Sequence, residues 1–285
     1  FAARLGIGRS YGSYEALLND PEIDAVYMPL PNSMHCEWAV KAARAGKHVL
    51  CEKPLALNAD QCLEMDAAAR ENGVLLMEAF MYRFHPQWQR ARDLVAAGAI
   101  GEVRAIDTLF TYTNTDPANI RNRADIGGGG LMDIGCYPIS QARYLLRGEP
   151  VRVLGRLEYD PAFGTDRLAS GVLDFGHAVA TFTVSTQLSP FQRVQVLGTR
   201  GRIEIEIPVN APPELSTRIW VREGDALREE TFPPCDQYTL QGDAFAHAVL
   251  DGTPGLVPLD DAVANMRVID AVRSSHRDGG WVRLA

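Results

Sequence analysis

The chain has 285 residues, of which 46% are hydrophobic and 22% are charged, and its formal net charge is −8. This composition lies close to the average of globular proteins, so we expect a substantial core, and the negative charge argues against nucleic acid as a partner. No apolar run approaches the ~18 residues of a membrane-spanning helix and no signal-peptide pattern opens the chain, so we expect no membrane partner and a cytoplasmic location.

The first third of the chain alternates apolar strands with helices. Apolar stretches that read as strands are separated by amphipathic stretches with short connections, and Ser13 and Asn58 stand where helix caps are expected. This order predicts parallel strands with right-handed crossovers, and therefore a doubly wound α/β sheet. The predicted helices are 13–18, 35–45 and 58–72, and the predicted strands are 23–28, 48–51 and 74–80.

After residue 84 the pattern changes to that of an α+β protein. A helix is predicted over 86–97, a long strand over 103–112 and an irregular polar loop over 114–125. The glycine run (127–130) then leads into a helix over 131–146. We therefore expect a parallel portion over 1–84 and, over 85–285, a portion with a large, mostly antiparallel sheet. The remaining predicted strands are 152–159, 169–175, 178–187, 194–197, 202–207, 217–222, 227–232 and 281–284, with helices over 240–250 and 260–275.

Cysteines and histidines show no pattern of metal ligands. The five cysteines form no Cys-x-x-Cys pair and the six histidines are scattered. We expect reduced thiols, as in a reducing cytoplasm, and no metal site.

The first candidate for chemistry is Lys53, in the stretch Glu52-Lys53-Pro54. The apolar strand before it predicts that Lys53 lies where a buried parallel strand leaves its sheet, and ligands of open α/β sheets bind at that edge. Pro54 favours an extended conformation at Lys53, so the lysine can direct its cation at a reacting oxygen. A solvated loop lysine is the alternative that this stretch alone leaves open.

The second candidate is the segment that follows the glycine run. Asp133 and Tyr137 are four residues apart, so they share one face of the predicted helix, and Asp133 lies in its first turn, where the helix dipole favours a negative charge. A carboxylate and a phenol beside glycines suit the binding and deprotonation of a hydroxyl group. A glycine hinge with a buried tyrosine remains the alternative.

Three further stretches stand near the same predicted edge. The turn at 29–35 leaves a strand and starts a helix, so it faces a cofactor or is simply a capped turn. Tyr82 and Arg83 leave the last parallel strand and either reach the edge of Lys53 or pack between the two portions. Arg121 precedes the glycine run and by default belongs to a solvated loop.

Together, Glu52-Lys53-Pro54 and the run from Gly127 to Tyr137 resemble the glucose-fructose oxidoreductase / inositol dehydrogenase (Gfo/Idh/MocA) family. The stretch 78–86 and the ending Cys136-Tyr137 are most similar to its NADP-dependent D-xylose 1-dehydrogenase and dihydrodiol dehydrogenase branch. The resemblance implies a Rossmann domain that binds NAD(P), with NADP favoured, and a sheet-rich domain that contributes to the substrate site and pairs two copies through its open sheet. The implied reaction moves a hydride between the cofactor and the CH–OH group of an aldose or a related sugar or diol.

The resemblance also assigns roles to residues. It implies that Tyr137 is the acid/base, that Lys53 lies beside the nicotinamide and that Asp133 binds substrate hydroxyls. Lys53 is expected to lower the proton affinity of Tyr137. The expected cofactor contacts are Pro29, Leu30, Asn32, His35, Glu52, Lys53, Pro54, Arg83 and Arg121, and the expected substrate contacts are Tyr82, Asp133 and Tyr137.

The family begins with a strand, a Gly-x-Gly-x-x-Gly turn, a helix and a second strand, whereas residues 1–6 resemble the end of the next helix. We therefore expect a fragment of an enzyme, with a partial dinucleotide-binding domain over 1–84 and a substrate and dimerisation domain over 85–285. The alternatives are a non-catalytic, ligand-sensing member of the same fold and an inactive truncated chain. A glycoside hydrolase with a pair of carboxylates is a weaker possibility.

Overall fold

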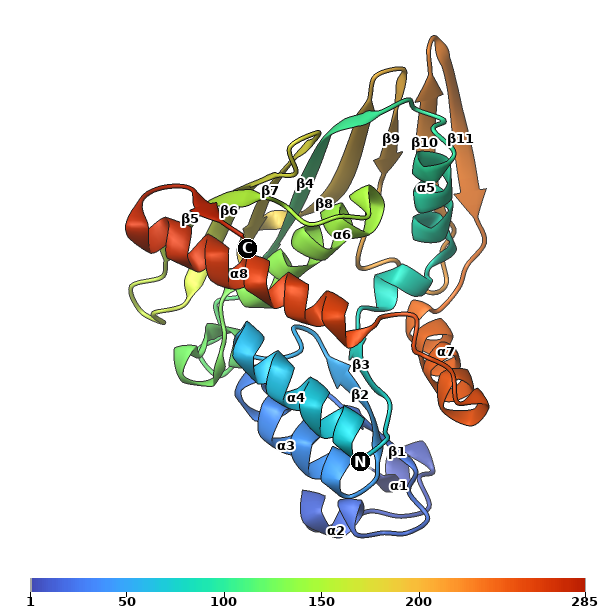
Figure 1. The fold of residues 1–285 in the computed structure, drawn as a ribbon, viewed down its shortest axis with the longest axis vertical. Coiled ribbons are helices and arrows are strands. Elements are labelled where there is room, and N and C mark those ends of the chain that lie inside the picture. Colours follow the sequence, from blue (N-terminus) through green and yellow to red (C-terminus); the bar gives the residue numbers. More distant parts are fainter. Residues whose placement is uncertain (1, 285) are drawn as a thin grey trace.

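The computed structural model describes residues 2–284, which form two β-sheets (Figure 1). The smaller sheet is three-stranded and parallel, in the order β1-β2-β3. The central strand carries Val49 and Cys51, both 0% exposed, as expected for a strand that is covered on its faces. The predicted parallel α/β portion is therefore confirmed. Its strands are β1 (Ala25–Met28), β2 (His48–Glu52) and β3 (Leu76–Ala79).

Two long helices, α3 (Asn32–Arg44) and α4 (Ala59–Glu71), lie side by side against this sheet (Figure 1). The Asn58 side chain accepts a hydrogen bond from Gln61 N at 2.9 Å, so the predicted cap of α4 is confirmed. Helix α3 begins at Asn32, three residues before the predicted start. The predicted turn at 29–35 is therefore shorter than expected, because Pro31 is the N-cap of α3 and proline is tolerated at the beginning of a helix. Two short helices precede this sheet, α1 (Ala2–Leu5) and α2 (Tyr14–Leu18), and Ser13 caps α2 as predicted.

The larger sheet has nine strands in the order β11-β10-β9-β8-β4-β7-β6-β5-β12. All neighbours are antiparallel except β4 and β7, which pair in parallel. The predicted large, mostly antiparallel sheet is therefore confirmed. The strands are β4 (Val103–Thr113), β5 (Arg152–Tyr159), β6 (Asp166–Asp174), β7 (Val179–Ser185), β8 (Gln187–Gly198), β9 (Gly201–Ile205), β10 (Thr217–Glu223), β11 (Ala226–Phe232) and β12 (Val282–Arg283).

The helices of this second portion connect the two sheets. Helix α8 (Leu259–Asp278) packs against both β5 and α4, and Figure 1 shows it crossing between the sheets. One hydrophobic cluster accordingly contains Val49 of the small sheet and Phe110 of the large sheet. The other helices are η1 (Met81–Phe84), α5 (Pro86–Ala96), η2 (Ile120–Asn122), η3 (Ala124–Ile126), η4 (Leu131–Gly135), α6 (Cys136–Leu146) and α7 (Gln237–Asp251).

The predicted helix over 131–146 has the expected extent, but its first turn, η4, is a π-helix that continues into α6. A π-turn places successive side chains differently from an α-turn, and such turns are often found at functional sites. Asp133 lies within this π-turn, and Tyr137 is the second residue of α6.

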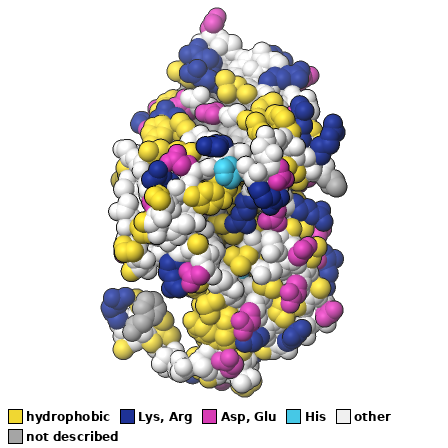
Figure 2. Space-filling model, turned by 90° about the vertical axis from the view of Figure 1, so that its left-hand side faces the viewer, with side chains coloured by type: hydrophobic (Ala, Val, Ile, Leu, Met, Phe, Trp, Pro, Cys, Tyr) yellow, Lys and Arg dark blue, Asp and Glu magenta, His cyan; other side chains and the backbone are white. Residues whose placement is uncertain are grey.

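The surface is mixed in charge. On the face shown in Figure 2, acidic and basic side chains are interspersed among apolar ones. Exposed ion pairs such as Arg70–Asp66, at 2.8 Å, contribute about 0–1 kcal/mol each, so the buried cluster dominates stability. Among residues 2–284, no helix is both long and apolar enough to cross a membrane.

Candidate active site

A pocket of about 830 Å³ opens where β1 and β2 end, and the glycine run faces it from the other side. Ligands bind at this edge of open α/β sheets because the strands end there and the loops diverge. Most of the predicted site residues line this pocket, together with Gly127 and Gly128. They are Pro29, Leu30, Asn32, Glu52, Lys53, Arg121, Asp133 and Tyr137.

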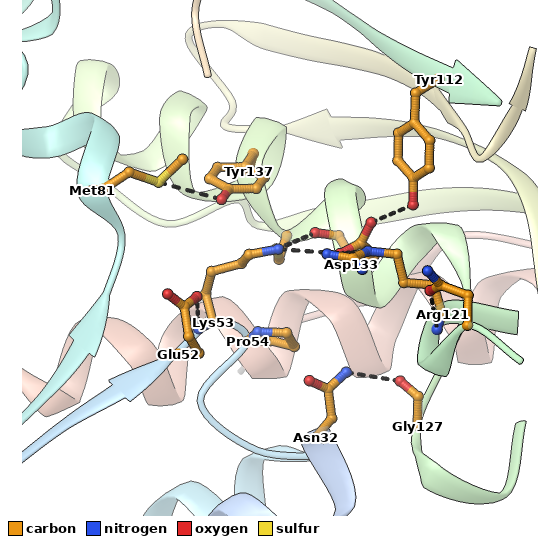
Figure 3. Close-up of polar contacts among 12 residues, drawn as sticks. Asn32, Glu52, Lys53, Pro54, Met81, Tyr112, Arg121, Gly127, Asp133 and Tyr137 are labelled. Carbon is orange, nitrogen blue, oxygen red and sulfur yellow. Dashed lines mark hydrogen bonds and ion pairs between the residues drawn. The ribbon is translucent and has the colours of Figure 1, made fainter. Parts of the chain in front are cut away.

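Lys53 follows the last residue of β2, and its side chain is only 12% exposed. Its Nζ donates to the main-chain oxygen of Asp133 at 2.7 Å and to the carboxylate Oδ1 of Asp133 at 3.3 Å (Figure 3). Burial lowers the pKa of Lys53, but Tyr137 and Asp133 raise it more, so the pKa lies well above its ordinary value. Lys53 is therefore a fixed cation rather than a proton donor of ordinary strength.

Asp133 is held by three side chains. Besides Lys53, its carboxylate lies 3.0 Å from Nε of Arg121 and accepts a hydrogen bond from the hydroxyl of Tyr112 at 2.6 Å (Figure 3). Burial raises the pKa of Asp133, but the two cations and the tyrosine hydroxyl lower it more, and the pKa lies below its ordinary value. Asp133 therefore stays ionised and can accept hydrogen bonds from a ligand.

Tyr137 is 4% exposed and borders the same pocket. Its hydroxyl donates to Sδ of Met81 at 3.4 Å, and Nζ of Lys53 lies 4.9 Å from the centre of its ring (Figure 3). Lys53 lowers the pKa of Tyr137, as the sequence predicted, but burial is the larger effect and raises the pKa well above its ordinary value. The phenol therefore keeps its proton. A thioether is a weak acceptor, so the hydroxyl can exchange Met81 for a stronger partner.

The walls of the pocket are fixed by contacts between loops. The ring of His35 lies 2.8 Å from the main-chain oxygen of Leu30 and 3.1 Å from that of Pro54, so it joins the two loops that leave β1 and β2. Asn32 donates to the main-chain oxygen of Gly127 at 2.8 Å, which ties the first of these loops to the glycine run (Figure 3). The pocket is therefore bounded by loops that are already connected to one another.

The glycine run needs glycine for a steric reason at Gly129. Its φ is +118°, and a Cβ atom there would lie 2.1 Å from the carboxylate Oδ1 of Asp166. The other oxygen of this carboxylate accepts a hydrogen bond from Leu131 N at 2.6 Å. Asp166 thus caps the beginning of the helical segment, and a side chain at position 129 would displace it.

Four predicted site residues do not line the pocket in the described chain. Pro54 is buried within the loop that leaves β2, and the buried ring of His35 contacts its main-chain oxygen from α3. Tyr82 is 0% exposed and its hydroxyl lies 2.8 Å from Oγ of Ser140, while Arg83 donates to Asp261 at 2.6 Å. The structure thus favours the packing alternative for Tyr82 and Arg83, and direct contact of these four residues with cofactor or substrate stays a prediction.

Tyr112, Met81 and Asp166 contact residues of the site but were not predicted from the sequence. Tyr112 lies near the end of β4, and its reach to Asp133 depends on how that strand sits over the glycine run. Met81 is an apolar residue in an apolar stretch, so nothing in the sequence indicated its contact with Tyr137. Asp166 precedes a predicted strand and is 35 residues from its partner Leu131. None of these contacts has a local sequence signal.

The residues present fit a nicotinamide nucleotide. The pocket lies at the strand edge that such cofactors use, and its lining combines the prolyl turn at 29–32 with a cation at Lys53 and a half-buried acid at Glu52. Residues 2–284 contain no group of three or more His, Cys, Asp or Glu side chains that could hold a metal ion.

Comparison with known proteins identifies both portions. Residues 1–80 match the model of an oxidoreductase family with an NAD-binding Rossmann fold, and residues 88–204 match the model of the GFO/IDH/MocA C-terminal domain. An uncharacterised oxidoreductase of Rhizobium meliloti is 46% identical over 98% of this chain and 86% of its own length. The NADP(+)-dependent D-xylose 1-dehydrogenase 2 of Haloferax volcanii is 41% identical over 99% of this chain and 87% of its own.

A solved structure is similar over nearly the whole chain. The aldose-aldose oxidoreductase from Caulobacter crescentus, complexed with glycerol, superposes with a TM-score of 0.91 at 32% identity, covering 99% of this chain and 87% of the other. The family models and this structural neighbour agree with the fold. The chain therefore belongs to the GFO/IDH/MocA family of oxidoreductases with an NAD-binding Rossmann fold.

Proposed function

We propose that the protein is an NADP-dependent oxidoreductase acting on the CH–OH group of an aldose or a related sugar or diol, with Tyr137 and Lys53 as its acid/base pair. NADP is proposed because the D-xylose 1-dehydrogenase relative uses NADP(+), and the aldose-aldose oxidoreductase supports a sugar. The observation that carries the proposal is the convergence of Lys53, Asp133 and Tyr137 on one pocket.

The nicotinamide, when bound, supplies the acceptor or donor of the hydride. Tyr137 would exchange the proton of its hydroxyl with the substrate oxygen, after that hydroxyl has left Met81. An ammonium group has three protons, and Lys53 directs two contacts at Asp133, so the third proton can be directed at the same substrate oxygen. This cation would stabilise negative charge that develops on the oxygen.

Asp133 would bind a neighbouring hydroxyl of the substrate. Its carboxylate is ionised and borders the pocket, and a sugar or diol offers hydroxyl groups as donors. Arg121 is 41% exposed and also contacts the carboxylate, so it covers Asp133 on the solvent side. Binding through two oxygens would orient the reacting carbon toward the cofactor.

The raised pKa of Tyr137 has a consequence for direction. A phenol that keeps its proton is ready to donate it, which serves carbonyl reduction, whereas oxidation requires the phenolate. The rate of oxidation should therefore increase with pH across the alkaline range, and the rate of reduction should not. Initial rates in both directions over a pH series measure this difference.

The test of the proposed pair uses Tyr137→Phe and Lys53→Met. Removal of an acid/base typically costs about 10²- to 10⁴-fold in rate, so kcat should fall by that amount in both variants. The affinity for NADP should change little in Tyr137→Phe. Tyr144→Phe and Lys47→Met are matched controls, because Tyr144 lies outside the pocket lining and Lys47 precedes β2, where its amine donates to the main-chain oxygen of Asp20. Both controls should keep the wild-type kcat.

Full activity of both site variants would contradict the assignment of the pair. If the wild-type protein binds NADP or a sugar but turns over no sugar or diol, the non-catalytic alternative replaces the proposed reaction. We further propose a cytoplasmic homodimer that pairs through the open face of the large sheet. Leu109, Phe191 and Leu197 are 37%, 47% and 38% exposed on that face, and the molecular mass in solution measures the pairing.

A further inference from the structure

The buried acid Glu78 has no role in the proposed chemistry, yet it contacts the loop that carries Lys53. Glu78 lies on β3, is 0% exposed and pairs across the small sheet with Cys51 of β2. Its Oε1 accepts a hydrogen bond from Leu55 N at 2.7 Å, and its Oε2 is buried without a hydrogen-bond partner in the described structure. A buried carboxyl group with only one such bond is costly, which calls for an explanation.

The position of Leu55 supplies that explanation. Leu55 is two residues after Lys53, and it is 0% exposed, so its N–H has no access to solvent. Further along the same loop, Leu57 N donates to Oε1 of Gln61 at 3.1 Å and Arg273 donates to the main-chain oxygen of Leu57 at 3.1 Å. The His35 ring contacts the main-chain oxygen of Pro54 at 3.1 Å, and the bond to Glu78 is the next contact along the loop. These two contacts therefore limit the movement of Lys53 more directly than those at Leu57 do.

We propose that Glu78 is a positioning residue, which holds the loop after β2 so that the amine of Lys53 stays in contact with Asp133, and that it does so as the neutral acid near pH 7. The kinetic part of this inference rests on the proposed function, whereas its structural part does not. Glu78 acts through Leu55 and Lys53, and it touches no reacting atom.

The groups around Glu78 determine its charge. Burial is the largest effect and raises its pKa, and Asp261 of α8 raises it further; the N–H of Leu55, Arg83 of η1 and Arg143 of α6 act in the opposite direction. The resulting pKa is about 8. The other titratable groups nearby are the thiols of Cys51 on β2, Cys62 on α4 and Cys136 on α6, whose own pKa values are raised by burial.

The sign of the pH effect follows from this shift. The unfolded chain releases the proton of Glu78 near pH 4.5, the ordinary pKa of a glutamate side chain, whereas the folded chain keeps it up to about pH 8. Between these values the folded state binds more protons, so this group's contribution to stability is full at low pH and is lost as pH rises toward 8. The contribution is constant at higher pH.

Glu78→Gln separates the two parts of the proposal. The amide oxygen of Gln can accept the same bond from Leu55 N, so kcat near pH 7 should stay within about twofold of wild type, because Gln resembles the neutral acid. The amide does not titrate. Melting temperatures of both proteins are measured from pH 5 to 9. The melting temperature of the wild type should fall relative to that of Glu78→Gln as pH rises, and the difference should become constant above about pH 8.

Glu78→Leu removes the acceptor. Its kcat should fall about 10- to 100-fold with a smaller change in KM, since a displacement of about 1 Å at a catalytic group has effects of this size. Gln61→Leu is the matched control, because it removes an acceptor from the same loop at Leu57 and should leave kcat unchanged. A crystal structure of Glu78→Leu should show that the 2.7 Å contact between Lys53 Nζ and the Asp133 oxygen is lost, and the control should retain it.

The two parts of the proposal, the neutral acid and the positioning role, can each be overturned by a separate result. Parallel pH curves for wild type and Glu78→Gln would overturn the neutral-acid part, and this comparison remains possible if the leucine variant does not fold. An unchanged Lys53 contact, or equal losses of kcat in Glu78→Leu and Gln61→Leu, would overturn the positioning role. A wild-type protein without turnover would contradict the proposed function alone, because the melting curves and the crystal structures do not depend on it.

Discussion

Asp133 is the residue on which the charge of the pocket depends. Lys53 and Arg121 both contact it, so two cations surround one carboxylate, and Tyr112 adds a neutral donor. The group of four therefore has a net positive charge next to Tyr137. A positive site at this position favours an oxygen that gains negative charge during the reaction, which agrees with the proposed chemistry at a CH–OH or carbonyl carbon.

Tyr112→Phe tests the third donor to Asp133. Loss of a hydrogen bond to a charged group should raise the KM for the sugar about tenfold, because Asp133 becomes less fixed, while kcat changes less. Because folding lowers the pKa of Asp133, this carboxylate stabilises the folded chain at pH values above its pKa in the unfolded chain. The stabilisation is lost as pH falls through its pKa in the folded chain. Without Tyr112 the folded pKa increases, so acid unfolding should begin at a higher pH.

The control for this prediction is Tyr144→Phe. Tyr144 lies on α6 outside the pocket lining, and its ring packs against the guanidinium groups of Arg83 and Arg92 rather than against a carboxylate. Its acid-unfolding midpoint, followed by circular dichroism, should remain that of the wild type. An acid-unfolding midpoint of Tyr112→Phe identical to that of the wild type would contradict the role of Tyr112.

At the scale of the element, the π-turn at Leu131–Gly135 depends on the cap that Asp166 provides. The turn carries Asp133, and α6 follows it with Tyr137. The position at which this segment begins therefore determines where both side chains lie. Asp166 belongs to β6 of the large sheet. The sheet therefore positions the segment that carries Asp133 and Tyr137 through one buried carboxylate.

Gly129→Ala should disturb this arrangement. Its Cβ would meet Asp166 at 2.1 Å and the residue has a positive φ, so the loss of unfolding free energy should be about 3 kcal/mol, with a parallel loss of kcat. Gly73→Ala is the matched control, since Gly73 has a φ of +63° but open space around its Cβ position. The control should lose only about 1 kcal/mol in urea unfolding and keep its activity. Equal losses in the two variants would exclude the steric role of Asp166.

The elements and the central site residues could be predicted from sequence because their signals are local. Ser13 and Asn58 cap the helices that follow them, and strand alternation revealed β4. The π-turn was not predicted, because residues 129–143 are all buried except Asp133, so the apolar pattern has no exposed face whose phase an extra residue could shift. Tyr112 and Asp166 could not be found, since their contacts join segments that the sheet pairing brings together. The division of domains at residue 84 stays a prediction.

At the scale of the whole molecule, α8 connects the two sheets through buried charges. Asp261 accepts a hydrogen bond from Arg83 at 2.6 Å and lies 3.1 Å from Nη2 of Arg143. Farther along the helix, Asp270 accepts from Ala59 N at 3.0 Å, at the beginning of α4. The side chains of Arg83 and Arg143 are 8% and 3% exposed. Arg143 also pairs with Glu149 at 2.6 Å, so Arg83 is the cation that depends most on Asp261 for compensation.

Asp261→Asn should therefore destabilise the whole chain. Removal of one partner from a buried pair leaves uncompensated charge and typically costs about 3–5 kcal/mol. Arg83 loses its carboxylate partner in this variant, whereas Arg143 keeps Glu149. Asp260→Asn is the matched control on the same turn of α8, because Asp260 is 85% exposed and pairs with Arg70 at 3.5 Å, so its loss should be below about 1 kcal/mol. Urea unfolding followed by tryptophan fluorescence measures both, since Trp38 lies on α3 and Trp88 on α5. Because α8 packs on both sheets, the Asp261→Asn protein should still unfold in one transition at lower urea. A loss no larger than that of Asp260→Asn would show that apolar packing alone holds the two sheets together.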